Sequence, residues 1–172
     1  MIKLKTILIL SGYQLTWLLC IFGEYFYNSF IPGLVCGLFF LIIIFFNSKN
    51  KKKLIFITSI LSTAGYFFDS CLVYLKIYNF ETSLYFGFLP IWMLVLWPSF
   101  TILFDEVFVF LSNYKFLAII SSGILGPLTY YSGSSLGLIS INQLSLFFIL
   151  MVAFWISLMF FYIKYLAKLK FI

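Results

Sequence analysis

The sequence predicts an all-α integral membrane protein: a bundle of about six transmembrane helices, with both termini in the cytoplasm and with bends in the fourth and fifth helices. Composition is the first observation behind this prediction. Of the 172 residues, 64% are hydrophobic and 9% are charged, whereas a soluble domain carries about 25% charged residues. Charges this sparse cannot cover a globule of this size in water, but they suit a surface that faces lipid.

Apolar runs of spanning length are the second observation. A helix needs about 20 mostly apolar residues to cross the hydrocarbon core of a bilayer. The loops between the runs leave no room for a soluble domain, so residues 1–172 are expected to form one polytopic membrane domain. In the first run, Gly12, Tyr13 and Gln14 interrupt the apolar stretch, which favours a retained helix over a cleaved signal peptide. The predicted helices cover residues 6–23, 31–46, 54–76, 88–111, 114–131 and 143–166.

The distribution of lysines is the third observation, and it sets the orientation. Cytoplasmic loops of membrane proteins carry an excess of basic residues. With six spans and the N-terminus inside, only Lys76 falls on the outer side. The lysines expected on the cytoplasmic side are Lys3, Lys5, Lys49, Lys51, Lys52, Lys53, Lys115, Lys164, Lys168 and Lys170. A missed or an extra span would scatter these residues over both sides.

Several chemistries are excluded by the residues that the chain lacks. There is no His and no Arg, so histidine-based catalysis, histidine-ligated metals and bidentate guanidinium recognition are absent. Cys20, Cys36 and Cys71 are isolated and form no metal-binding or redox motif. The lysines lie at the ends of apolar runs rather than in one patch, which argues against nucleic-acid binding. We therefore predict no metal, no cofactor and no nucleic-acid partner.

Asp69 is the candidate functional residue among the five acids. It lies roughly 22 Å along the third predicted helix from Leu54, below the outer surface of the membrane. An intramembrane acid is costly and usually faces the interior of a bundle or a wet cavity. A functional role and a purely structural interhelical hydrogen bond both remain open for it. The other four acids are expected at solvent or headgroup level: Glu24, Glu81, Asp105 and Glu106.

The fourth predicted helix carries Trp92, Trp97 and Pro98. Pro98 lies in mid-span and leaves the carbonyl of Leu94 without its usual partner, which predicts a bend and leaves room for a cavity. Trp92 fits the outer aromatic belt of a membrane protein. Trp97 lies too deep for that belt and is expected to face protein.

The fifth predicted helix contains Gly123, Gly126 and Pro127, with Tyr130 and Tyr131 at its outer end. Small residues allow membrane helices to approach closely. The proline predicts a second bend, and a packing kink and a cavity lining are both open interpretations of it.

These residues define a candidate pocket in the outer half of the membrane. Gln14, near the middle of the first helix, is expected to make an interhelical hydrogen bond. The candidate ligand-binding residues are Asp69, Trp92, Trp97, Tyr130, Tyr131 and Gln14, and the candidate structural kinks are Pro98, Pro127, Gly123 and Gly126.

The same stretches resemble a bacterial membrane protein family, the domain of unknown function 2878. The matching pieces are Gln14-x-x-Trp17, Gly65-x-x-x-Asp69, Pro90-x-Trp92, Leu96-Trp97-x-x-Phe100, and Gly126-Pro127-Leu128-x-Tyr130-x-x-Gly133 with Gly137. They occur in the expected order over most of the chain, and Pro98 after Trp97 is a departure from the pattern. The resemblance implies a small multi-pass protein of the bacterial inner (cytoplasmic) membrane, and it implies no reaction.

Three functions remain open from the sequence. The first is binding or transport of a lipid-like or small apolar molecule in the pocket around Asp69. The second is an accessory or assembly subunit of a membrane complex, for which the glycine-rich fifth helix would form the partner interface. The third, less favoured, is a membrane-embedded enzyme that modifies lipid with Asp69 as acid or base, because no second catalytic group supports it. Whether the protein is an enzyme is therefore undecided at this point.

Overall fold

The structure, a computed structural model, describes residues 4–82, 84–108 and 113–169, and it confirms a helical fold. Lys3, Lys170 and residues 109–111 of the predicted fourth helix lie outside the described residues. Within them there are six α-helices: α1 Leu4–Tyr27, α2 Ile31–Asn47, α3 Lys51–Tyr74, α4 Met93–Glu106, α5 Lys115–Ser135 and α6 Leu144–Phe161, which the π-helical turn η2 Tyr162–Leu166 continues.

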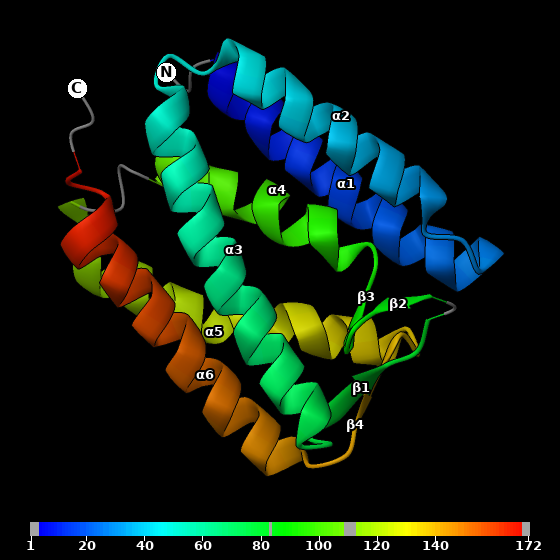
Figure 1. Cartoon of the computed structure of the whole chain (residues 1–172). Coiled ribbons are helices and arrows are strands. Elements are labelled where there is room, and N and C mark those ends of the chain that lie inside the picture. The colour runs from blue at the N-terminus through cyan, green and yellow to red at the C-terminus, as the bar shows by residue number, and fades with distance from the viewer. Residues whose placement is uncertain (1–3, 83, 109–112, 170–172) are drawn as a thin grey trace.

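Two antiparallel helix pairs, α1–α2 and α5–α6, flank a centre made by α3 and α4 (Figure 1). Helix α4 packs against α1, α2 and α3. Helix α3 reaches α6 through Phe68 and Phe154, whose rings stack at 3.8 Å between centroids. The start of α1 and the end of η2 lie at the same end of the bundle.

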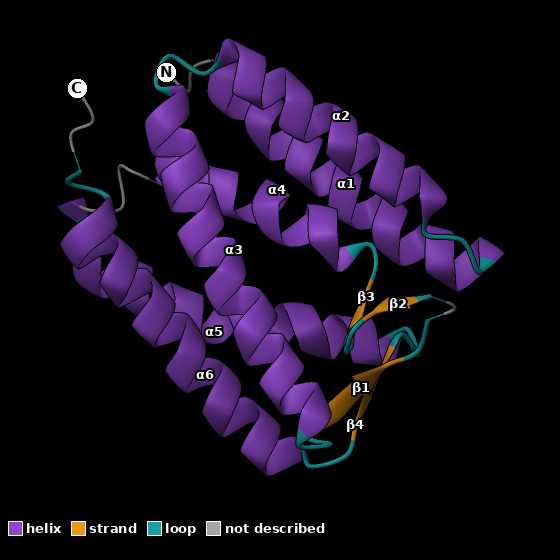
Figure 2. Ribbon diagram, viewed as in Figure 1, coloured by secondary structure: helices purple, strands orange, loops and turns teal. Residues whose placement is uncertain are grey.

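Four short strands gather at the opposite end of the bundle (Figure 2), and the sequence did not predict them. β1 (Tyr78–Phe80) pairs antiparallel with β4 (Ile139–Ile141), with Asn79 opposite Ser140. β2 (Tyr85–Phe86) and β3 (Leu89–Pro90) form a hairpin. Its turn begins at Gly87 with φ +65°, a conformation that glycine adopts without a steric penalty. Strand β1 thereby ties the segment after α3 to the segment after α5.

Three of the helical segments are long and apolar enough to cross a membrane: Lys5–Tyr27, Lys51–Tyr74 and Leu144–Leu166. Helix α2 is apolar but shorter. Helix α4 has 14 residues, which gives about 21 Å of helix against a hydrocarbon core of about 30 Å. By length and composition these three helices indicate a membrane protein, whereas α2, α4 and α5 do not meet both criteria.

Ion pairs join the helices at the end where α1 begins. Lys5 Nζ lies 2.5 Å from Glu106 Oε2, and Lys53 Nζ lies 2.6 Å from Asp105 Oδ1. The Tyr162 hydroxyl donates to the carbonyl of Phe104 at 2.5 Å. The end of α4 is thus held by α1, α3 and η2. Asp105 and Glu106 are the last two residues of α4, each is paired with a lysine, and their placement at solvent or headgroup level stays a prediction.

Several predicted boundaries and one predicted environment were wrong. Helix α4 begins at Met93 rather than near residue 88, because Leu89–Pro90 forms β3 instead. Helix α1 continues to Tyr27 rather than ending at residue 23. Glu24 therefore lies inside the helix, where it is only 5% exposed and accepts a hydrogen bond from the Thr82 hydroxyl at 2.6 Å. Pro98 and Pro127 lie within α4 and α5, and the bends expected at them stay predictions.

The glycines of α5 face α6 of the same chain. A Cβ at Gly126 would lie 2.3 Å from the Trp155 ring, and one at Gly123 would lie 2.8 Å from Ile156. Only glycine permits so close an approach, as small residues do at membrane helix interfaces. The Gly123 and Gly126 positions of α5 therefore pack within the molecule, and an interface of α5 with a partner stays a prediction.

Gly126→Leu should consequently destabilise the protein. The added side chain would press on the Trp155 ring, and overpacking of this kind costs about 1–3 kcal/mol. The measurement is the thermal unfolding midpoint of the purified protein in detergent, with Ile124→Leu, on the exposed side of α5, as control. An unchanged midpoint for Gly126→Leu would contradict the α5–α6 packing described here.

Candidate functional site

The buried carboxylate of Asp69 lies at the centre of a hydrogen-bond cluster. Its side chain is 0% exposed. The Tyr78 hydroxyl donates to Oδ1 at 2.7 Å, and Trp97 Nε1 donates to Oδ2 at 2.8 Å. The Tyr130 hydroxyl lies 2.9 Å from Oδ1 and 2.8 Å from Oδ2. Three donors from β1, α4 and α5 thus converge on one residue of α3, which satisfies a group that would be costly to bury alone.

Gly65 and Asp69 act together one helical turn apart. A Cβ at Gly65 would lie 2.4 Å from the indole of Trp97, so glycine leaves the space in which that ring rests against α3. Asp69, four residues later on the same face, accepts the N–H of the same ring. In the spacing Gly65-x-x-x-Asp69, the glycine therefore leaves room for the Trp97 ring and the aspartate accepts its hydrogen bond.

Tyr78 is the member of the cluster that the sequence analysis missed. It lies in β1, in the segment between the third and fourth predicted helices, and it is fully buried. Burial, followed by the neighbouring Asp69 carboxylate, raises the pKa of the Tyr78 hydroxyl well above its ordinary value. The hydroxyl therefore keeps its proton and remains a donor. The only signal for it in the sequence was its position nine residues after Asp69.

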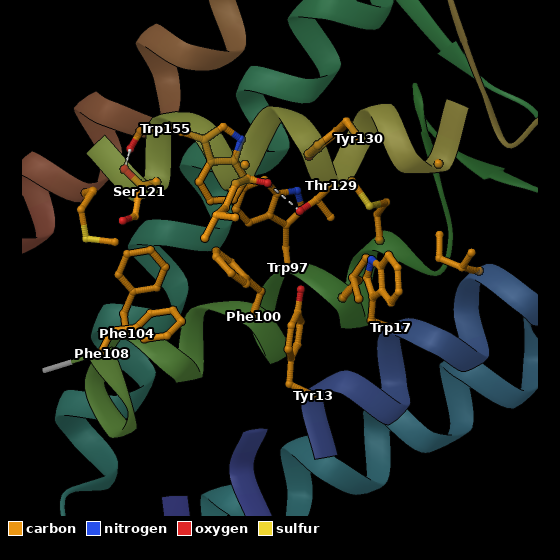
Figure 3. A pocket seen from close by; sticks show the side chains of 18 of the residues that line it. Tyr13, Trp17, Trp97, Phe100, Phe104, Phe108, Ser121, Thr129, Tyr130 and Trp155 are labelled. Carbon is orange, nitrogen blue, oxygen red and sulfur yellow. Dashed lines mark hydrogen bonds between the residues drawn. The ribbon is translucent and has the colours of Figure 1, made fainter. Parts of the chain in front are cut away.

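Trp97 and Tyr130 also form part of the wall of a cavity of about 240 Å³ (Figure 3). Asp69 does not line this cavity, because its carboxylate lies behind those two rings. All four tryptophans of the chain do line it: Trp17, Trp92, Trp97 and Trp155. Phenylalanines of α4 extend the wall towards Phe104, roughly 18 Å along the helix from Trp92. The cavity is thus elongated, and ten of the 22 residues that line it are aromatic.

Two hydrogen-bond donors in the cavity wall have no partner among the described residues. The indole N–H groups of Trp92 and Trp155 are buried and make no hydrogen bond within the described part of the chain. Their side chains are only 4% and 7% exposed. No Asp, Glu or Lys is found among the described residues that line the cavity. The arrangement can therefore surround an apolar molecule and donate to an oxygen on it, but it offers no charge.

Comparison with known proteins places the chain in a family. The family model described as protein of unknown function (DUF2878) matches residues 6–161. The chain belongs to this family. Neither the comparison with curated proteins nor that with solved structures returned a match.

Most of the short motifs that carried the resemblance to DUF2878 meet at the cluster and the cavity. Gly65 and Asp69 support Trp97 from behind, as described above. The motif residues that line the cavity are Trp17, Trp92, Trp97, Phe100, Gly126, Tyr130 and Gly133. In this DUF2878 protein, motif residues from α1, α3, α4 and α5 therefore meet at the Asp69 cluster and the cavity beside it.

Two predicted site residues, Tyr131 and Gln14, lie away from both the cluster and the cavity. The Tyr131 ring lies 5.8 Å from that of Phe148 on α6, and Tyr131 does not line the cavity. Gln14 is exposed on α1. Its amide makes no hydrogen bond with another described residue, so the interhelical bond expected for it was not found.

A second hollow, of about 700 Å³, opens from the cavity to the surface between α1 and α5. Gln14, Leu10 and Ser11 line it from α1, and Leu128 and Ser132 line it from α5. Six residues line both this hollow and the cavity: Tyr13, Trp17, Phe100, Phe108, Leu125 and Thr129. We call this hollow the lateral mouth of the cavity.

Loss of a donor from the Asp69 cluster should weaken the fold. Tyr78→Phe and Tyr130→Phe each keep the ring but remove one hydrogen bond to a buried acid, at a cost of about 1–3 kcal/mol. Thermal unfolding in detergent measures this as a lowered midpoint for each variant. Tyr131→Phe is the matched control on α5, and it should leave the midpoint unchanged. If all three variants unfold at the same midpoint as the unsubstituted protein, the cluster contributes nothing to stability.

Proposed function

We propose that this protein binds a lipid-like, apolar molecule in the tryptophan-lined cavity between α1, α4, α5 and α6. The observation that carries the proposal is the gathering of all four tryptophans around one cavity. Ligand sites are typically concave and apolar, with a few placed polar groups. The cavity has this character.

The two unpaired indole N–H groups support an occupant. A buried donor without a partner costs about 1–3 kcal/mol. An oxygen on a bound molecule would satisfy the N–H of Trp92 or Trp155. Asp69 then has a supporting role, because it fixes the Trp97 and Tyr130 rings of the wall. This geometry does not favour Asp69 as the acid or base of an enzyme, since its carboxylate does not face the cavity.

Filling the cavity tests the proposal. Ser121 lines the cavity (Figure 3) and makes no hydrogen bond to another described residue through its side chain, so Ser121→Phe should fill it without leaving a partner unsatisfied. We expect native mass spectrometry of the purified protein to show a retained lipid-like molecule that Ser121→Phe loses.

Ile124→Phe adds a similar ring to the exposed side of α5, where Ile124 is 55% exposed and lines neither hollow. This control should keep the retained molecule. If both variants keep it, or if the original protein retains nothing, the cavity is not the binding site.

We further propose that all six helices take part in crossing the bacterial inner membrane, with both termini in the cytoplasm. The start of α1 and the end of η2 share one end of the bundle, and Lys5 and Lys53 form ion pairs at that end. Helix α4 is short, but the buried strand β3 precedes it. Non-helical backbone is tolerated at membrane depth where protein surrounds it.

Cysteine labelling tests the orientation. In a background in which Cys20, Cys36 and Cys71 are replaced, Glu81→Cys at the strand end should react with a membrane-impermeant maleimide in intact spheroplasts. Lys49→Cys, between α2 and α3, should react only after permeabilisation; both positions are exposed. The reverse pattern would show that the termini lie outside.

A further inference from the structure

The lateral mouth brings a polar side chain to a depth where lipid cannot satisfy it. Gln14 lies on α1, roughly 14 Å from Lys5 and roughly 20 Å from Tyr27, the two ends of a candidate span. It is exposed, and its amide makes no hydrogen bond with another described residue. An unsatisfied polar group in the hydrocarbon core costs several kcal/mol. A partner other than the described residues would therefore be favourable at this point.

The facing side of the mouth does not supply that partner. On α5, the Thr129 hydroxyl donates to the carbonyl of Leu125 at 2.9 Å, and the Ser132 hydroxyl donates to that of Thr129 at 2.6 Å. Both are turned to their own helix backbone. Gln14 is thus left as an amide that can donate and accept, at the point where the cavity opens towards the surrounding lipid.

The linings also select the charge of an occupant. Neither the cavity nor its mouth contains an acidic or basic side chain among the described lining residues. A charged group would lose its hydration there without gaining a counter-ion, which costs far more than burying a neutral polar group. The elongated aromatic wall along α4 suits a single hydrocarbon chain.

We infer that the ligand is a neutral single-chain amphiphile, such as a long-chain alcohol. It enters from the bilayer between α1 and α5, leaves its polar group hydrogen-bonded to Gln14, and extends its chain into the tryptophan-lined cavity. This inference rests on the proposed function, because it names the ligand class and the access route of the same cavity.

Quenching of tryptophan fluorescence by brominated probes tests the inference, since every tryptophan of the chain lines the cavity. The protein in lipid nanodiscs is titrated with three probes brominated at mid-chain: a long-chain alcohol, the matching alkane, and the matching fatty acid at a pH where it is ionised. Ser121→Phe, with the cavity filled, gives the background from probe dissolved in the lipid.

The alcohol should bind more tightly than the alkane and the ionised acid. Gln14→Leu should weaken binding of the alcohol about fivefold, as expected from loss of one membrane hydrogen bond of about 1 kcal/mol. Binding of the alkane should be unchanged. Retained quenching by the alkane also shows that the variant is folded with its cavity intact.

A variant of identical composition provides the matched control. Leu15 is 51% exposed and lines neither hollow, so Gln14→Leu combined with Leu15→Gln keeps an amide at the same depth but turns it away from the mouth. The double variant should bind the alcohol as weakly as Gln14→Leu. Full recovery of alcohol binding would overturn the role of Gln14.

The remaining outcomes separate the two proposals. Alcohol and alkane affinities that are equal, and unaffected by Gln14→Leu, would overturn the polar anchor while the cavity remains a binding site. An ionised acid that binds as tightly as the alcohol would overturn the neutral class. Quenching by all three probes no greater than the Ser121→Phe background would overturn the proposed function itself.

Discussion

The three hydrogen bonds to the Asp69 carboxylate are the interaction on which the rest of the site depends. They join α3 to β1, α4 and α5 through Tyr78, Trp97 and Tyr130. A bilayer offers no water to a buried polar group, so the carboxylate and its donors are bound to one another more strictly than they would be in a soluble protein. Helix α5 makes few other backbone approaches to the centre of the bundle, and the cluster and the β1–β4 pairing connect it there. The same hydrogen bonds therefore hold α5 in place and satisfy the buried side chain of Asp69.

The cluster also keeps the cavity apolar. Trp97 and Tyr130 turn their polar atoms outward to Asp69 and leave their ring surfaces for the cavity wall. Trp97 stacks on Trp155 with ring centroids 5.7 Å apart, and Trp155 in turn rests on α5 in the space that Gly126 leaves. A chain of contacts thus runs from an acid on α3 to a glycine on α5. The oxygens of Asp69 thus orient the wall, while no acidic or basic side chain among the described residues lines the cavity.

Much of this arrangement could be predicted from the sequence, and the failures have physical causes. The lengths of the apolar runs predicted six helices, and the unusual depth of Asp69 and Trp97 marked them as residues that must face protein. Tyr78 was missed because a strand of three residues carries almost no periodic signal, and its pairing with β4 depends on a segment about 60 residues away. Glu24 was assigned to solvent because an acid near a helix end usually lies there. The glycines of α5 predicted a close contact correctly, but small residues do not specify whether the neighbour belongs to the same chain.

The tryptophans provide the strongest reason to regard the cavity as a site and not as a fault of packing. Tryptophan in membrane proteins is enriched at the interfaces, where its N–H meets water or headgroups. Here all four surround one cavity, and Asp69 satisfies the N–H of Trp97 while those of Trp92 and Trp155 stay unpaired. Protein interiors are close-packed, and a void forfeits contacts on every side. A chain that combines such a void with unpaired donors, and opens it beside an unsatisfied amide at Gln14, carries several separate costs. One bound molecule would offset the cost of the void through its chain and the cost at Gln14 through its oxygen.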